Sequence, residues 1–149
     1  MNTNHAIDRV LETVIYANDL SKVLWFYEEF LELELFSYQP DRFAFFKCRH
    51  STVLIFNPEA TVNQNSFSGG SPVPPHGTIG AGHVAFAVSE ASLPFWRKRC
   101  NEFNLPIESE ILWPSNGRSI YFRDPANNSI ELATPNLWHL PEQTLATNE

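Results

Sequence analysis

The chain has 149 residues, 43% of them hydrophobic, and a formal net charge of −7, so we expect one compact domain with a core of its own. The acidic balance and the lack of a Lys/Arg run argue against nucleic-acid binding. No apolar stretch approaches the roughly 20 residues of a membrane span, and the first ten residues lack the apolar centre of a signal peptide. We therefore expect a cytoplasmic protein in which Cys48 and Cys100 are free thiols, with a disulfide as the less favoured alternative.

The first half of the chain predicts a strand, a helix and three further strands. Residues 9–17 are rich in Val, Ile and Tyr, which favour strands. Asp19 suits the cap of the helix that follows, whose apolar residues recur at three-to-four spacing as far as about Glu32. Three short strands are expected next, over residues 34–38, 42–48 and 52–57.

The second half repeats this order after an interruption. Residues 58–80 are rich in Pro and Gly and are expected to form a linker. A strand is then expected over residues 82–88, a helix from 89 or 90 to 104, and three strands over residues 107–113, 118–123 and 129–134. Residues that match at an offset of 71 include Glu12 with His83, Asp19 with Glu90, and Trp25 with Trp96.

The repeat predicts an α+β fold of two βαβββ modules, over about residues 9–57 and 81–135, within a single domain. A single helix covers only one face of the sheet in each module. Two modules can therefore share their open faces and enclose a cup, so the repeat alone predicts a cavity.

Three ionisable side chains are expected to face this cup. Glu131 lies between Ile130 and Leu132 in a predicted strand, where a carboxylate is costly unless it is paired or bound. Alternation along the strands places His83 and Glu131 on the face away from the apolar residues, and the repeat places Glu12 there as well. An imidazole with two carboxylates suits Mn, Fe, Mg, Ni or Zn and leaves coordination positions open for a substrate.

Each of these residues also has a plainer interpretation. His83 taken alone suits a satisfied, half-buried histidine. Glu12 can pair with Arg9 or Arg118, and Glu131 can form a salt bridge in a solvated cup. The metal hypothesis rests on the three residues occurring together.

The motifs that carry this pattern resemble one known superfamily. They are ETVIYANDL at residues 12–20, Trp25-Phe26-Tyr27, GHVAFAV at 82–88 and GRSIYFRDPANNSIELAT at 117–134. Over about residues 9–135 the chain resembles the vicinal oxygen chelate superfamily, which includes glyoxalase I, bleomycin-resistance proteins, fosfomycin-resistance proteins and extradiol dioxygenases. The resemblance implies a glyoxalase-like, cup-shaped, eight-stranded open barrel, a homodimer and a small-molecule substrate.

The resemblance also implies a site. His83 and Glu131 match two of the superfamily's metal ligands, and Glu12 stands where the family usually has His, so Glu12 is either the third ligand or a general base. The implied cofactor is a divalent metal, Mn, Fe, Ni or Zn. The implied activity is that of a lyase, a dioxygenase or a fosfomycin-type enzyme, with a metal-free binding protein of the bleomycin-resistance type as the alternative.

Neighbouring residues of the strand at 118–123 are further candidates. Tyr121 shares a strand face with Ser119, so its hydroxyl can reach a metal-bound substrate; the alternative is a cavity-wall aromatic without a chemical role. Ser119 and Arg118 are candidate substrate contacts, although Arg118 lies on the opposite strand face from Tyr121. His76 is expected to be a loop residue rather than a base.

Overall fold

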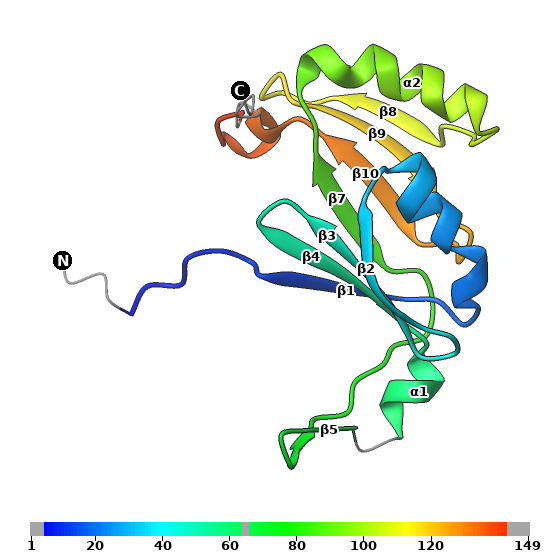
Figure 1. Cartoon of the computed structure of the whole chain (residues 1–149). Helices are drawn as coiled ribbons and strands as arrows, with labels where there is room; N and C mark the ends of the chain where they lie inside the picture. Colours follow the sequence, from blue (N-terminus) through cyan, green and yellow to red (C-terminus); the bar gives the residue numbers. More distant parts are fainter. Residues whose placement is uncertain (1–4, 64–65, 143–149) are drawn as a thin grey trace, which may run out of the picture. The chain divides into compact units, whose positions relative to one another are not determined.

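A computed structural model describes residues 5–63 and 66–142 of the chain (Figure 1). These residues fall into two compact units, with the boundary between Ile79 and Gly80. Each unit contains one four-stranded sheet, with helical segments between the first and second strands of that sheet. The predicted pair of βαβββ modules and the α+β fold class are therefore confirmed.

The first unit builds its sheet from β1 (Glu12–Tyr16), β2 (Glu34–Gln39), β3 (Phe43–Cys48) and β4 (Ser51–Phe56). The strand order is β1-β4-β3-β2, with β1 parallel to β4 and the other neighbours antiparallel. Between β1 and β2 the chain forms a 3-10 turn, η1 (Leu20–Lys22), and a π-helix, η2 (Phe26–Phe30).

The helix expected to follow Asp19 is therefore broken into two shorter elements. Asp19 is the N-cap, as predicted, and its carboxylate accepts a hydrogen bond from Ser21 N at 3.1 Å. Leu31 N then donates to Phe26 O at 2.9 Å, which is the five-residue spacing of a π-helix. The apolar periodicity thus predicted a helical segment correctly but not its hydrogen-bond pattern.

The core of the first unit is aromatic. Phe26, Tyr27 and Phe30 of η2 are fully buried. The rings of Tyr27 and Phe46 lie 5.4 Å apart, so η2 packs against β3 through aromatic contacts.

The segment expected as a linker, residues 58–80, contains regular structure. Asn57 caps a short helix, α1 (Pro58–Val62), by accepting a hydrogen bond from Glu59 N at 3.1 Å. A ribbon of β5 (Ser66–Ser68) and β6 (Ser71–Val73) follows, joined at a Gly-Gly turn with positive φ. Pro at a helix start and Gly in a turn permit these short elements, so the composition marked the connection correctly but not its content.

The second unit repeats the arrangement with β7 (His83–Ala87), β8 (Ser109–Leu112), β9 (Arg118–Arg123) and β10 (Ser129–Ala133), in the order β7-β10-β9-β8. A 3-10 turn, η3 (Glu90–Ser92), leads into the helix α2 (Leu93–Glu102), which lies along one face of this sheet in Figure 1. A last 3-10 turn, η4 (Pro135–Trp138), follows β10. The predicted core residues Ile130 and Leu132 are almost fully buried, at 0% and 1% exposure.

The eight strands do not form one continuous barrel sheet. Each first strand pairs in parallel with the last strand of its own unit, β1 with β4 and β7 with β10. Hydrogen bonding is therefore completed within each unit, so the eight strands of the predicted glyoxalase-like fold lie in two four-stranded sheets that are not closed into a barrel.

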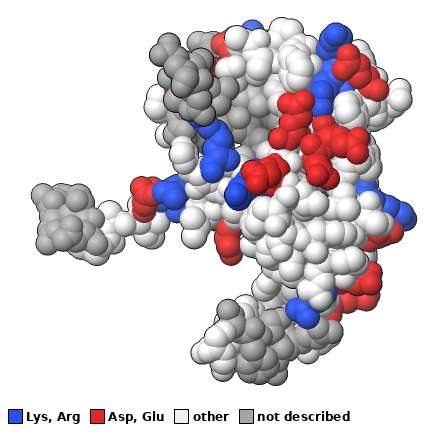
Figure 2. Space-filling view, viewed as in Figure 1, with Lys and Arg blue, Asp and Glu red and all other residues white. Residues whose placement is uncertain are grey.

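Charged side chains are distributed in small groups of both signs, as the face in Figure 2 shows. In the second unit several pair between neighbouring elements: Arg97 with Glu110 at 2.9 Å, Arg118 with Glu90 at 3.3 Å, and Arg123 with Glu108 at 2.7 Å. Within the part of the chain that the structure describes, no helix is both long enough and apolar enough to cross a membrane.

Candidate metal and substrate site

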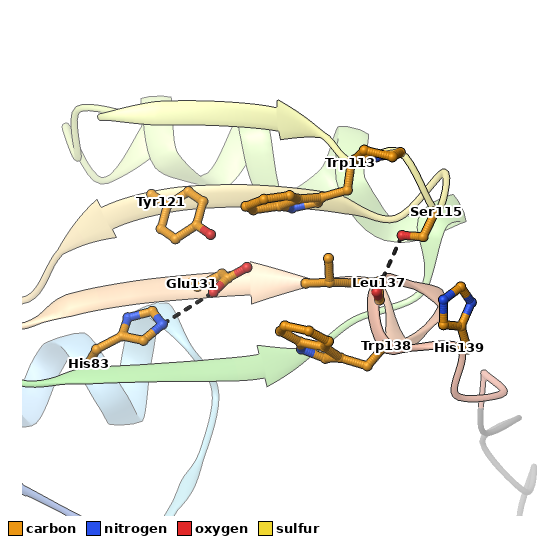
Figure 3. A pocket seen from close by; sticks show the side chains of 9 residues that line it. His83, Trp113, Ser115, Tyr121, Glu131, Leu137, Trp138 and His139 are labelled. Carbon is orange, nitrogen blue, oxygen red and sulfur yellow. Dashed lines mark hydrogen bonds and ion pairs between the residues drawn. The ribbon is translucent and has the colours of Figure 1, made fainter.

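The second unit contains a cavity of about 660 Å³ over its sheet (Figure 3). One end is polar and is lined by His83, Tyr121 and Glu131. The other end is largely apolar, with Trp113 and Trp138 among its walls. The volume lies within the range of pockets that hold small molecules.

Strand register brings the three polar residues together. Glu131 of β10 lies directly opposite Tyr121 of β9 and Ala85 of β7. His83 stands two residues before Ala85 and therefore shares its strand face. The predicted common face of His83, Tyr121 and Glu131 follows from this pairing.

Glu131 is buried, at 5% exposure, yet both of its carboxylate oxygens have neighbours. Ser119 Oγ donates a hydrogen bond to Oε1, and Oε2 lies 3.3 Å from His83 Nε2. Burying a carboxylate is costly without such partners. Glu131 is therefore held in one orientation, with Oε2 turned toward the histidine.

The protonation of His83 follows from its other nitrogen. Nδ1 lies 3.0 Å from the carbonyl oxygen of Ser129, which can only accept, so Nδ1 carries the hydrogen. In the neutral ring Nε2 then presents a lone pair to Glu131 Oε2. Two acceptors 3.3 Å apart require a proton or a cation between them, and an imidazole nitrogen with a carboxylate oxygen is a donor pair that would suit a divalent metal. The donor pair therefore fits a divalent metal.

Ser119 links Glu131 to a tryptophan that the sequence reasoning missed. Ser119 Oγ accepts a hydrogen bond from Trp113 Nε1 at 2.8 Å while donating to Glu131. Ser119 is 1% exposed and is not among the residues that line the cavity. Its hydroxyl therefore positions the Glu131 carboxylate and does not make the direct substrate contact that had been expected. Trp113 was expected as the last residue of the strand over residues 107–113, but β8 ends at Leu112, and no motif had marked the indole as part of the site.

Tyr121 lines the cavity beside these residues. Its ring centroid lies 6.3 Å from that of His83, with the two planes 23° apart. Burial, and then the neighbouring Glu131 carboxylate, raise the pKa of the Tyr121 phenol above its ordinary value. The hydroxyl is therefore protonated at neutral pH and acts as a hydrogen-bond donor beside the Glu131 carboxylate.

The turn between β9 and β10 fixes the start of β7. Asp124 Oδ1 accepts hydrogen bonds from Ala126 N at 2.9 Å and Asn128 N at 2.8 Å. Asn128 Oδ1 in turn accepts from Gly82 N at 2.8 Å, directly before His83. The turn chemistry read from the sequence thus also positions the histidine.

The remaining candidates lie elsewhere. Glu12 opens β1 in the first unit, and its side chain is exposed. Arg118 bonds Glu90 through Nε at 3.3 Å and is not among the residues that line the cavity. His76 also belongs to the first unit, where its Nδ1 lies 2.6 Å from the Tyr16 hydroxyl.

Among residues 5–63 and 66–142, no three His, Cys, Asp or Glu side chains gather closely enough to hold a metal ion. His83 and Glu131 supply two donors within one unit. The third, predicted at Glu12, stays a prediction.

The model of the Glyoxalase/Bleomycin resistance protein/Dioxygenase superfamily matches residues 6–132 of the chain. The chain belongs to this superfamily. The match ends before β10 does, so η4 and the cavity residues Leu137, Trp138 and His139 lie beyond the matched residues.

Solved structures agree with this assignment. A lactoylglutathione lyase from Agrobacterium tumefaciens is 32% identical and superposes with a TM-score of 0.84, over 91% of this chain and 99% of that one. FosX, a fosfomycin resistance protein from Mesorhizobium loti, shares the fold at 22% identity and a TM-score of 0.56, covering 85% and 91%. A virulence protein from Salmonella typhimurium also shares the fold, at 20% identity and a TM-score of 0.65, over 86% of this chain and 97% of that one. No curated protein sequence matches the chain significantly.

Proposed function

We propose that this glyoxalase-superfamily protein is a metal-dependent enzyme for a small molecule with two adjacent oxygens. His83 and Glu131 are the proposed metal ligands of the second unit, and Glu12 is the proposed third ligand. The observation that carries the proposal is the pair of acceptor atoms, His83 Nε2 and Glu131 Oε2, that face each other at 3.3 Å. A divalent ion between them satisfies both.

The metal, which is Mn, Fe, Ni or Zn on this proposal, supplies Lewis acidity to the substrate oxygens. The chain's own residues supply orientation and proton handling. Ser119 holds one oxygen of Glu131, so the other stays directed toward His83. Tyr121 presents a protonated hydroxyl at the polar end of the cavity, where it can donate to a substrate oxygen that gains negative charge.

Within the superfamily we favour a lyase, because the most identical of the structures named above is a lactoylglutathione lyase. The last sheet strand of the first unit offers no acidic residue that corresponds to Glu131. There Leu54 pairs with Val14 of β1 as Glu131 pairs with Ala85 of β7, so β4 offers an apolar residue at the matching place. A second role is therefore open to Glu12, as a general base beside the metal. The superfamily resemblance also supports a homodimer.

A metal-free binding protein of the bleomycin-resistance type is the second candidate. It is favoured by one observation, that no three candidate ligand side chains gather among the described residues. On this alternative a proton lies between His83 and Glu131, and the two form an ion pair. The cavity then binds a ligand without chemistry.

Metal analysis separates the two candidates. Protein dialysed against Mn²⁺, Ni²⁺ or Zn²⁺ and freed of excess ion is expected to retain about one ion per chain, because protein side chains hold the ion while other coordination positions stay open. Binding is expected to release a proton when it displaces one from His83. Glu131→Gln and His83→Ala are expected to lose the ion.

A matched control is Glu110→Gln, which removes an equivalent carboxylate from β8 outside the cavity. That variant should bind metal as the wild type does. Failure of the wild type to retain any of these ions, or equal retention by Glu131→Gln, would contradict the metalloenzyme proposal and leave the binding protein.

A further inference from the structure

The end of the cavity away from His83 has walls from two separate segments. Trp113 comes from the loop after β8, and Leu137 and Trp138 come from η4. Figure 3 shows the two indoles on opposite sides of Glu131, both extending over the sheet toward the polar end. Neither segment belongs to the ligand-bearing strands, and η4 lies outside the superfamily match.

Trp113 is held in place by its own nitrogen. Nε1 donates to Ser119 Oγ at 2.8 Å, so the polar edge of the indole is satisfied inside the protein. The remainder of the ring is left to line the cavity. The ring is thus a fixed wall rather than a mobile surface group.

The η4 turn is fastened to the same loop. Ser115 Oγ donates to Leu137 O at 3.3 Å, and Asn136 Nδ2 donates to Asn116 O at 3.3 Å. Gly117 lets the two segments touch, because a Cβ at this position would lie 2.4 Å from Leu137 Cα. Trp138 is therefore held in place by contacts between η4 and a loop about twenty residues earlier in the sequence.

Trp138 nevertheless leaves 74% of its surface exposed. A large apolar ring held next to a cavity and open to water is typical of a binding surface. Its neighbours in the cavity wall, Leu137 and Trp113, make the surface continuous. A flat apolar group between the indoles would remove this area from water.

We infer that the cavity takes a two-part ligand: an oxygen-bearing head at His83 and Glu131, and a flat, aromatic body held between Trp113 and Trp138. The head rests on the proposed function, whereas the body rests on the two tryptophans alone. The cavity volume of about 660 Å³ suits a small molecule of two or three fused rings rather than a peptide segment.

Hydroxamates test this inference, because they carry two adjacent oxygens and can be made with substituents of different size. Acetohydroxamate, benzohydroxamate and 2-naphthohydroxamate are titrated into Mn²⁺-loaded protein by calorimetry. We expect affinity to rise with ring area, with 2-naphthohydroxamate at least about 10-fold tighter than acetohydroxamate. In Trp138→Ala this advantage should fall to about 3-fold or less, while acetohydroxamate binds as before.

Phe95→Ala is the matched control, since Phe95 is an exposed aromatic residue of α2, 49% exposed and outside the cavity. It should leave all three affinities unchanged. Equal affinity of the wild type for the three probes would overturn the inference, as would an unchanged preference in Trp138→Ala. Trp138→Ala that turns a dimer into a monomer without changing the affinities would also overturn it, and would assign the surface to a second copy of the chain.

A fourth probe, 2-naphthol, separates the inference from the proposed function. Binding of 2-naphthol without metal that is lost in Trp138→Ala supports the aromatic body even if acetohydroxamate never binds. That result would reject the metal-dependent binding of the head and would still support the binding of an aromatic group by the two tryptophans.

Discussion

The orientation of Glu131 depends on the buried Ser119 and, through Ser119, on Trp113 of the cavity wall. Ser119 donates to Glu131 and accepts from Trp113 Nε1, so the carboxylate, hydroxyl and indole form one chain of hydrogen bonds. Partners behind a metal ligand typically change metal affinity by about 10- to 100-fold when removed. We expect Ser119→Ala to weaken Mn²⁺ binding by about 10-fold and to destabilise the fold by about 1–3 kcal/mol, since Trp113 Nε1 loses its acceptor.

Trp113→Phe is the informative comparison for that variant. It keeps an aromatic ring in the wall but leaves Ser119 free to donate to Glu131. Metal affinity, measured by calorimetry, should therefore be nearly unchanged, and thermal unfolding should show a loss of about 1 kcal/mol or less. A Trp113→Phe variant that loses metal as fully as Ser119→Ala would show that the indole, not the hydroxyl, orients the carboxylate.

The buried thiol of Cys100 makes folding stability depend on pH in the alkaline range. It is a free thiol, as the sequence predicted, and is 1% exposed. Burial, and then Glu110, raise its pKa from 9.0 to about 11. The unfolded chain therefore loses this proton first, so folding stability falls as pH rises between 9 and 11, by at most about 3 kcal/mol.

Chemical denaturation across this pH range measures the effect. Cys100→Ala should have lower stability at neutral pH because of the cavity it leaves, but a flatter decline between pH 9 and 11. The folded wild type should also resist thiol reagents at Cys100 near neutral pH. Parallel declines in the two proteins would show that the thiol does not titrate in this way.

At the scale of elements, the turn at Asp124–Asn128 connects two strands to a third. Asn128 is 1% exposed, and its Oδ1 accepts from Gly82 N directly before His83. We expect Asn128→Ala to destabilise the second unit by about 1–3 kcal/mol, because Gly82 N loses its partner. Metal affinity should fall too, since the start of β7 is less firmly placed.

Asn127→Ala is the neighbouring comparison, measured by denaturant unfolding and calorimetry. Asn127 has a positive φ of 68°, so Ala there costs some stability through the backbone. The hydrogen bond to Gly82 N comes from Asn128 and is kept in this variant, so metal affinity should be kept. Loss of metal in both variants to the same extent would indicate a general loosening of the turn rather than a role of the Asn128 side chain.

The sequence predicted these elements well where periodicity and turn chemistry act locally. The strand at 118–123 has the predicted bounds, and alternation placed Glu131 and Tyr121 on one face. Trp113 was predicted only as the last residue of a strand, and its role with Trp138 in the cavity wall was missed. The two segments meet through the close approach of Gly117 to Leu137, which no local pattern encodes. The π-helix was missed for a related reason, since its hydrogen bonds have no distinct sequence period.

At the scale of the whole molecule, two units of one architecture carry different chemistry. The second unit has a histidine at the start of its first strand and a buried glutamate on its last, whereas the first unit has Glu12 and Leu54 at the matching positions. The two units therefore share strand order and pairing but differ in the polar residues on their first and last strands. On our proposal the second unit dominates metal binding, and Glu12 contributes one further oxygen.

The central claim is that a divalent metal is bound through a single imidazole, that of His83. Electron spin echo envelope modulation of Mn²⁺-loaded protein, with and without ¹⁵N-labelled histidine, tests it directly. The account predicts the signal of one coordinated imidazole in the wild type and its loss in His83→Ala. A metal-loaded wild type without an imidazole signal, or a signal that persists in His83→Ala, would contradict the account.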